Sequence, residues 1–379
     1  MIFFTIATLT PLPLLLAAST FGGIWAAAAL VYMTALAAGL DALVSRVSPS
    51  QKGEEFPAAD ALSVVLAFGH FAVMASAVAG LAGDWLAFWE RIALFLAAGM
   101  FLGQVGNSNA HELVHRSNRS LRRLGRLVYR SHIFGHHGSA HLLVHHVSVA
   151  TPADPNTARA GESFYRFAPR AWIGSFRKGF RAESARRARR GDGIWRHPYF
   201  GDLVATLALV LGALAYGGPA ALAAFFALSA YATVQLLMSD YVQHYGLTRG
   251  LQEGGSPEPV GPQHSWDSPH WFTSGLMLNA PRHSDHHLNP QKPYPALELT
   301  SAPRLPYSLP IMATLAYAFE PAKLAAIPDL PLSTWGWIAY SGLMSSIVGH
   351  GGMTWLFQRY PVAVVSPLTL PTPLISVAI

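Results

Sequence analysis

The sequence predicts an all-α integral membrane protein, with six transmembrane helices and a histidine-rich helical cap on the cytoplasmic side. Three observations predict it. The 379-residue chain is 51% hydrophobic and only 12% charged, whereas soluble domains carry about 25% charged residues. Several apolar segments are long enough to span a bilayer. Most of the 17 histidines lie in two polar segments between or after these spans. The low charge content argues against the alternative, a soluble helical protein with buried helices.

The predicted spans each approach the length of about 20 apolar residues that a bilayer requires. The first is not a signal peptide by its pattern, because it lacks a basic start, contains Pro11 and Pro13, and runs directly into another span. Short turns at 19–23 and 217–219 predict helical hairpins. The six spans are 2–18, 22–44, 60–82, 88–108, 202–217 and 219–238.

Basic residues orient these spans. Arginines are dense after the fourth span, at 116–130, and again at 166–196. Because positively charged loops stay on the cytoplasmic side, we expect two large cytoplasmic segments, 109–200 and 239–331, in a multi-pass protein of the inner (cytoplasmic) membrane. The formal charge of +6 suits anionic lipid or an acidic protein partner, and in a membrane protein these are favoured over nucleic acid.

Residues 164–196 alternate aromatic and basic side chains. This pattern fits an amphipathic helix lying on the inner leaflet. It also fits a docking face for an acidic protein, or a solvated loop that obeys the positive-inside rule. The sequence leaves these three interpretations open.

Nine histidines stand in four motifs, NAHELVHR, HLLVHH, VQHYGL and PRHSDHH. The four-residue spacing in the first motif places both rings on one face of a helix. Burying so many imidazoles costs solvation unless each finds a partner, and neutral imidazole is the commonest protein ligand for metals. The candidate ligands are His111, His115, His141, His145, His146, His244, His283, His286 and His287.

The number of candidate ligands limits which metal ions the site can hold. Zinc sites use three or four protein ligands, so nine nitrogens indicate two ions with four or five ligands each, an arrangement that suits iron, copper or nickel. Soluble ferritin-like sites use glutamates instead. The chain has no cysteine, which excludes thiolate sites and any rubredoxin or ferredoxin domain within it.

The motifs HELVH, HLLVHHVSVATPADP, YVQHYGL and PRHSDHH resemble, in order, those of membrane-bound alkane 1-monooxygenases, which belong to the wider fatty-acid desaturase and hydroxylase class. The resemblance runs from about residue 20 to about residue 325. It implies two non-haem irons, dioxygen as oxidant, and electrons from rubredoxin and its NAD(P)H-dependent reductase. The implied reaction is terminal hydroxylation of medium- or long-chain alkanes to primary alcohols, with the chain aligned in an apolar slot.

Two positions depart from the family pattern. Ala140 and Gln243 stand where glutamates usually precede a motif histidine. Carboxylates near a metal ligand commonly orient its ring, so these changes bear on metal affinity, rate or substrate identity.

The other histidines are expected to support the ligands or to be structural. A second HxxxHH pattern lies upstream of the second motif, but VATPADP follows His146, as the resemblance requires, so the upstream set is rejected as ligands; His136 remains a candidate to support a ligand. His264 and His270 are further candidates for such support. The rejected set is His132, His136 and His137; His70, His197 and His350 are expected to be structural.

Three other functions compete with this one. HELVH also fits HExxH, in which Glu112 would be the general base of an intramembrane zinc protease, but that leaves seven of the nine histidines unused. A metal transporter would need polar groups near the bilayer midplane. Desaturation or hydroxylation of a lipid or fatty-acyl chain is the alternative within the same class.

The chain is expected to divide into a hydroxylase domain, 1–331, and an apolar tail, 332–379. The tail resembles the C-terminal part of EamA-type transporters. It is interpreted as a fused or frameshifted fragment, with a native membrane hairpin as the alternative, and we expect it to supply no metal ligand.

Overall fold

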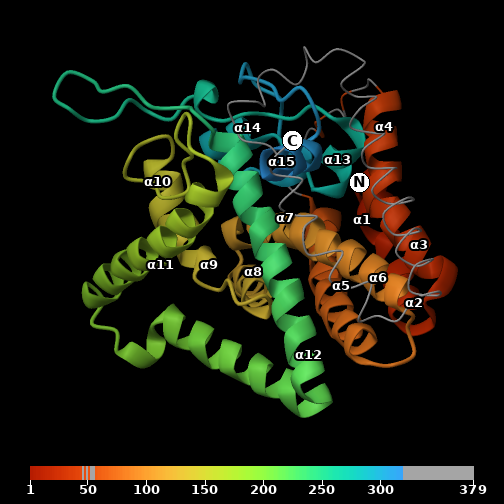
Figure 1. The fold of residues 1–379 in the computed structure, drawn as a ribbon. Coiled ribbons are helices and arrows are strands. Elements are labelled where there is room, and N and C mark those ends of the chain that lie inside the picture. Colours follow the sequence, from red (N-terminus) through yellow and green to blue (C-terminus); the bar gives the residue numbers. More distant parts are fainter. Residues whose placement is uncertain (45–46, 48–49, 52–55, 319–379) are drawn as a thin grey trace, which may run out of the picture. The chain divides into compact units, whose positions relative to one another are not determined.

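The computed structural model describes residues 1–44, 47, 50–51 and 56–318. Every helix-or-strand element assigned in this part is a helix (Figure 1). Pairing of β type is limited there to two isolated bridges. The all-α prediction is confirmed. The predicted tail, 332–379, and His350 lie outside the described residues.

The N-terminal part forms two helical spans that meet at a tight turn. The first span consists of α1 (Ile2–Leu9) and α2 (Pro11–Phe21). The second contains α3 (Gly23–Val31), the π-helical turn η1 (Tyr32–Leu36) and α4 (Ala37–Leu43). Gly22 has φ 59° and ψ −136°, a conformation that glycine adopts without steric cost. The hairpin predicted at 19–23 is therefore present.

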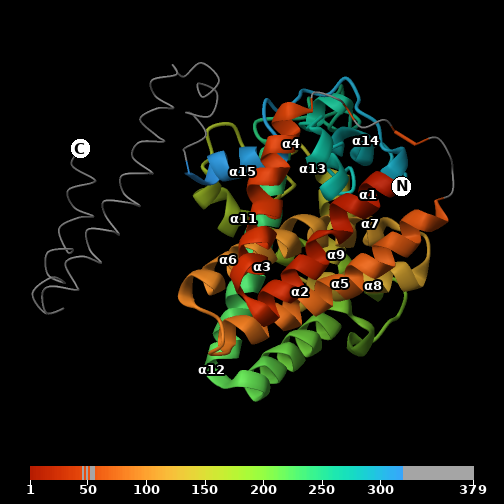
Figure 2. The same cartoon turned by 90° about the vertical axis from the view of Figure 1, so that its right-hand side faces the viewer.

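A second pair of spans carries the first histidine motif. Helix α5 (Pro57–Ala82) is followed by α6 (Phe88–Met100), the π-helical turn η2 (Phe101–Gly106) and α7 (Asn107–His115). The fourth apolar helix thus continues to His115, beyond the predicted end at 108. Figure 2 shows these helices packed beside the N-terminal pair.

In the part of the chain that the structure describes, five helices are long and apolar enough to cross a membrane, and the chain is a multi-pass membrane protein. The sequence predicted six spans. The last two lie within one helical segment, α12 (Pro198–His244), which is broken at Gly217 and Gly218. Gly218 has φ 61° and ψ −150°, so the chain turns a sharp corner there (Figure 1). Its first half exposes Leu203 and Leu207 by 65% and 56%, as a lipid-facing surface would.

Shorter helices between and after the spans carry the remaining motif histidines apart from His244, which ends α12. Between α7 and α12 lie α8 (Arg119–Ser131), α9 (His137–Ala140), the π-helical turn η3 (His141–His145), α10 (His146–Ser148), α11 (Phe164–Ala188) and η4 (Ile194–Arg196). After α12 come η5 (Pro262–His264), α13 (Trp271–Leu276), α14 (His283–Leu288), η6 (Tyr294–Ala296) and α15 (Leu309–Ala318). In Figures 1 and 2 the segments after α12 gather at one end of the helical bundle.

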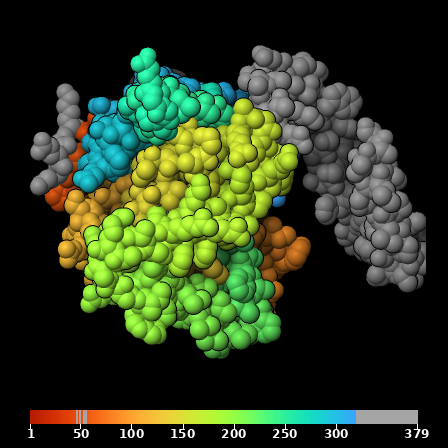
Figure 3. All heavy atoms as spheres, turned by 90° about the vertical axis from the view of Figure 1, so that its left-hand side faces the viewer, coloured from red at the N-terminus to blue at the C-terminus, as the bar shows by residue number. Residues whose placement is uncertain are grey.

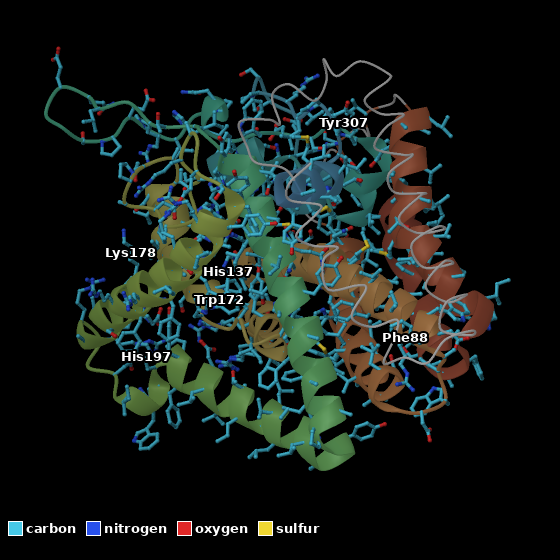
Figure 4. The ribbon with its side chains drawn as sticks, in the orientation of Figure 1. Phe88, His137, Trp172, Lys178, His197 and Tyr307 are labelled. Atoms are coloured by element: carbon cyan, nitrogen blue, oxygen red, sulfur yellow. The ribbon has the colours of Figure 1, made fainter. Side chains whose placement is uncertain are left out.

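The aromatic and basic segment forms helix α11, which lies on the surface together with the first half of α12 (Figure 3). Phe164 and Phe167 are buried, whereas the other aromatic side chains of this helix are 37–60% exposed. Trp172 contacts Phe134 edge to face, with ring centroids 5.4 Å apart, and Phe176 contacts Tyr199 at 5.2 Å. Figure 4 shows Trp172, Lys178 and His197 around this helix. The helix is confirmed, while the choice between lipid and protein as its partner stays a prediction.

Candidate metal centre

Polar anchors on two neighbouring helices position the first motif. The Asn107 side chain donates hydrogen bonds to the carbonyls of Gly103 and Ala232, both at 2.9 Å, which ties α7 to α12. The Asn109 side chain donates to the carbonyl of Ser63 at 2.8 Å, which ties α7 to α5. These bonds fix the rotation of α7 about its axis, and hence the direction of its two histidines.

Two aspartates hold the last motif. Asp267 accepts hydrogen bonds from the backbone N–H and hydroxyl of Ser284, at 2.8 and 2.7 Å. Asp285 accepts from Asn289 and from Lys292, both at 2.8 Å. Helix α14 has only six residues, too few to be stable alone, so these contacts determine where its histidines point.

All nine predicted histidines come together, in two groups. Within each group the ring nitrogens that can bind a metal lie within 4.8 Å of one another. The five-histidine group is His111, His115, His141, His146 and His286, and the four-histidine group is His145, His244, His283 and His287. Among the described residues, no carboxylate belongs to either group.

Contacts within the five-histidine group do not form a set of hydrogen bonds. The Nε2 atoms of His115, His141 and His146 lie 3.0, 3.0 and 3.1 Å apart in a triangle. In neutral imidazole an Nε2 atom is either a donor or an acceptor. If all three contacts were hydrogen bonds, one Nε2 atom would have to be donor and acceptor at once. At least one of the three contacts is therefore not a hydrogen bond. A cation among the three nitrogens satisfies all of them.

The same distances favour right-angled coordination. Two nitrogens at a right angle on a metal, with bonds of about 2.1 Å, lie about 3.0 Å apart, whereas tetrahedral bonds separate them by about 3.4 Å. His244 and His287 show the same spacing from His283, 3.0 and 3.1 Å between Nε2 atoms. The Nε2 atoms of His111 and His145 are buried without a hydrogen-bond partner. The donor set therefore fits metal ions of higher coordination than structural zinc.

Burial keeps the imidazoles in the neutral form that binds metal. Burial, reinforced by the charges that neighbouring rings would carry, lowers the pKa well below the usual histidine value for the site residues outside the apolar helices, His141, His146, His283, His286 and His287. His145 differs. Burial opposes its charge, but the charge and hydrogen bond of Asp154 outweigh this and raise the pKa of His145.

Asp154 is a site residue that the sequence analysis did not single out. Its Oδ2 lies 2.8 Å from Nδ1 of His145, and its carboxylate also accepts hydrogen bonds from Thr157 and the backbone of Asn156. A carboxylate on the far nitrogen fixes the tautomer and direction of a ligand ring. Its signal in the sequence is the aspartate of VATPADP. His264 assists through its backbone carbonyl, 3.4 Å from Nδ1 of His244.

The two departures from the family pattern have structural counterparts. Ala140 is buried against α11, where a Cβ added to Gly179 would lie 3.0 Å from the Ala140 Cβ. A longer side chain at 140 would push α11 away. Gln243 accepts a hydrogen bond from Ser239 at 3.0 Å and donates to the carbonyl of Ala280 at 3.3 Å. Both of its polar ends are therefore engaged in local contacts.

The carboxylate of Glu112 does not belong to either group. It accepts hydrogen bonds from Arg116 at 2.8 Å and from the backbone of Tyr294 at 3.2 Å. An HExxH protease needs this glutamate free as a base beside the metal, and here it holds α7 in place. This geometry disfavours the protease alternative.

The remaining histidines lie outside both groups, as far as the structure describes them. His136 lies 3.3 Å from Ser175, and His197 lies 3.2 Å from Ser184. His70 pairs with Ser131 at 2.8 Å, and its ring lies 5.7 Å from that of His132. The ring of His270 contacts Ser268. His137 lines a cavity described next.

Two hollows reach the histidine groups. The inner cavity has a volume of about 100 Å³, and His111, His141 and His283 form part of its wall, so it touches both groups. The basic hollow has a volume of about 880 Å³ and reaches His115 and His146. Its wall also includes Arg116, Arg122 and Lys292. The two hollows share no histidine, so the site is approached from two faces.

Comparison with known proteins places this fold and site in a class. Residues 83–314 match the family model described as fatty acid desaturase, and this segment contains all nine histidines. The chain belongs to the fatty acid desaturase family.

Several of its relatives are alkane 1-monooxygenases, which confirms the resemblance seen in the motifs. The chain is 31% identical over 269 residues to an alkane 1-monooxygenase of Pseudomonas putida, covering 70% of this chain and 66% of the relative, just under two thirds. It is 31% identical over 306 residues to alkane 1-monooxygenase 1 of Pseudomonas aeruginosa, covering 77% of this chain and 79% of the relative. It is also 28% identical over 184 residues, or 48% of each chain, to the xylene/toluene monooxygenase hydroxylase component of Pseudomonas putida.

Proposed function

We propose that this protein hydroxylates the terminal carbon of medium- or long-chain alkanes to give primary alcohols, using dioxygen at a centre of two non-haem irons. The observation that carries the proposal is the convergence of nine imidazoles in groups of five and four beside one cavity. The similarity to alkane 1-monooxygenases supplies the substrate class.

The donor set supports iron over zinc. Nitrogen ligands at right-angle spacing suit redox-active metals, and structural zinc closes at four tetrahedral ligands. We assign the five-histidine group to one iron and the four-histidine group to the other. When bound, the two irons supply the reduction of dioxygen and the attack on an unactivated C–H bond.

The protein supplies orientation and exclusion of water. The inner cavity follows the α6–η2–α7 segment from Met100 to His111, which corresponds to about 16 Å along a helix. A hydrocarbon chain lying in it has one end beside the histidines. Apolar walls such as Met277 and Leu309 keep bulk water from the reacting carbon. One oxygen atom enters the C–H bond, and the other leaves as water with two electrons and two protons.

The electrons come from a separate protein in this proposal, because the chain has no cysteine for an internal iron–sulfur centre. We assign this role to rubredoxin, supplied by its NAD(P)H-dependent reductase. The basic hollow is the proposed docking site. It combines three cationic side chains with the two histidines, His115 and His146, that line it, and charge complementarity steers an acidic partner to such a surface.

The proposed orientation places the site at the cytoplasmic face of the inner membrane. The two halves of α12 count as the fifth and sixth spans, because the break at Gly217 and Gly218 separates them and turns the chain through a sharp corner. Basic residues of α8 and α11 support this orientation under the positive-inside rule.

The test uses purified protein in lipid, loaded with iron, together with rubredoxin, its reductase and NADH. Octane, hexadecane and a fatty-acyl lipid are supplied separately. Octanol or hexadecanol as product supports the proposal. A modified lipid with no alkane product would favour the lipid alternative, and turnover with NADH alone would contradict the need for a separate donor. Peptide cleavage that is lost in Glu112→Gln would establish the protease.

A further inference from the structure

The inner cavity contains buried polar atoms that have no partner in the protein. The Tyr129 side chain is fully buried, and its hydroxyl has no hydrogen-bond partner. His137 is 3% exposed, and its Nδ1 is also unpartnered. Both side chains line the cavity. Leaving a buried polar atom unpaired is unfavourable, so such a wall does not suit a cavity that holds only hydrocarbon.

These two side chains lie together, beside the proposed metal ligands. The ring centroids of Tyr129 and His137 are 4.9 Å apart, and those of His137 and His141 are 5.1 Å apart. His137 belongs to neither histidine group. Figure 4 shows it in the interior, near Trp172. We call Tyr129 and His137 the polar corner. It lies at the end of the cavity where the substrate is oxidised.

We propose that the polar corner binds an oxygen atom of the substrate, one or two bonds from the carbon that is hydroxylated. The preferred substrates are then chain molecules with an ether or similar oxygen function near the reacting end. This inference rests on the proposed function and narrows its substrate class. A phenol O–H donates to such an oxygen, and one nitrogen of a neutral imidazole does the same. An alkane leaves both groups unpaired.

A substrate with two different ends gives a direct test. 1-Methoxyheptane is matched in length to n-nonane and can enter the cavity with either methyl group first. With the ether end at the histidines, hydroxylation replaces a C–H bond of the methoxy carbon, and the resulting hemiacetal splits into 1-heptanol and formaldehyde. One atom of dioxygen enters the product and the other leaves as water, with two electrons from the donor and two protons. With the alkyl end first, the product is 7-methoxyheptan-1-ol.

The ratio of the two products is measured in the iron-loaded enzyme with its electron donor. We expect the ether end to be favoured in the wild type, and Tyr129→Phe and His137→Phe each to lower the ratio roughly fivefold, the loss of one neutral hydrogen bond. Tyr294→Phe is the matched control, because its hydroxyl is equally buried and unpartnered but lies outside the cavity wall. That variant should keep the wild-type ratio.

Competition in the wild type provides a second measurement that needs no variant. 1-Methoxyheptane should inhibit octane hydroxylation roughly fivefold more strongly than n-nonane does. Equal inhibition, or a product ratio that both cavity variants leave unchanged, would show that the polar corner holds water only and would overturn the inference. Absence of product from octane as well would instead refute the proposed function.

Discussion

Asp154→Asn is expected to weaken metal binding at the four-histidine group while leaving the five-histidine group loaded. The carboxylate lies 2.8 Å from Nδ1 of His145, and only His145 among the nine histidines has such a carboxylate contact among the described residues. The amide retains the shape and an acceptor oxygen but loses the charge that holds the proton on Nδ1. The effect should therefore be largely confined to the group that contains His145.

The magnitude follows from the role of the contact. Loss of a partner that orients a ligand typically reduces metal affinity by about 10- to 100-fold, which corresponds to about 1.4–2.7 kcal/mol. After dialysis against a chelator of graded strength, the variant should hold about half the iron of the wild type per chain, and hydroxylation should fall with it. Iron is measured by elemental analysis, and the secondary structure by circular dichroism.

Asp41→Asn is the matched control. Asp41 is a buried carboxylate that accepts hydrogen bonds from the backbone of Phe272 and Thr273, at 2.8 and 3.0 Å. Its loss should reduce thermal stability without changing the iron content of folded protein. An Asp154→Asn variant with full iron and wild-type affinity would refute the role of Asp154. A folded variant that loses all its iron would refute the separation into two groups.

Three further predictions concern docking, packing and the C-terminal tail. Arg122→Glu should raise the KM for rubredoxin about tenfold at low salt, with the difference shrinking as salt rises, because this cation lines the basic hollow. Gly103→Ala should lower the thermal midpoint and cost about 1–3 kcal/mol, because its Cβ would lie 2.2 Å from Nε2 of Gln235 and 2.9 Å from that residue's Cβ. Truncation after Asp329 should preserve iron content and hydroxylation, because the sequence assigns no ligand beyond His287.

Each of these has its own control and contrary outcome. Arg196→Glu changes an exposed cation away from the hollow and should leave the KM for rubredoxin unchanged; a similar rise in both cases would point to net charge instead of docking. Gly39→Ala adds a methyl group where nothing lies within 4 Å, so equal destabilisation would contradict the packing argument. A truncated protein that reaches the membrane without iron would show that the tail belongs to the enzyme.

The nine candidate ligands could be named from the sequence because motif histidines are a chemical signal that does not depend on the tertiary fold, and the structure brings all nine together. The division of these histidines into two groups could not be predicted from the sequence. His145 and His146 are neighbours in the chain, yet they belong to different groups, because consecutive side chains on a helix point about 100° apart. In α14, His283 and His287 share one group while His286 joins the other. The group that each histidine joins depends on the rotation of its helix about its own axis. Long-range contacts, such as that between Asp267 and Ser284, determine this rotation.

The spans were predictable to the extent that hydrophobicity marks them. Apolar length located five helices correctly, but it could not show that the fourth of them continues through η2 and α7 to His115, because the residues at that end are polar and are buried by other parts of the protein. It also could not distinguish a turn from the break inside α12 at Gly217 and Gly218. The sequence did not reveal the role of Asp154, because its contact with His145 depends on how the loop between them folds. No regular sequence spacing predicts that contact.

The central claim is that the nine histidines hold two irons, one in each group. The most direct measurement is a structure of the protein purified with iron, with anomalous scattering recorded at the iron edge. We expect two peaks per chain, one among His111, His115, His141, His146 and His286, and the other among His145, His244, His283 and His287. A single peak, a zinc signal in its place, or a metal bound by His132, His136 and His137 would contradict the account.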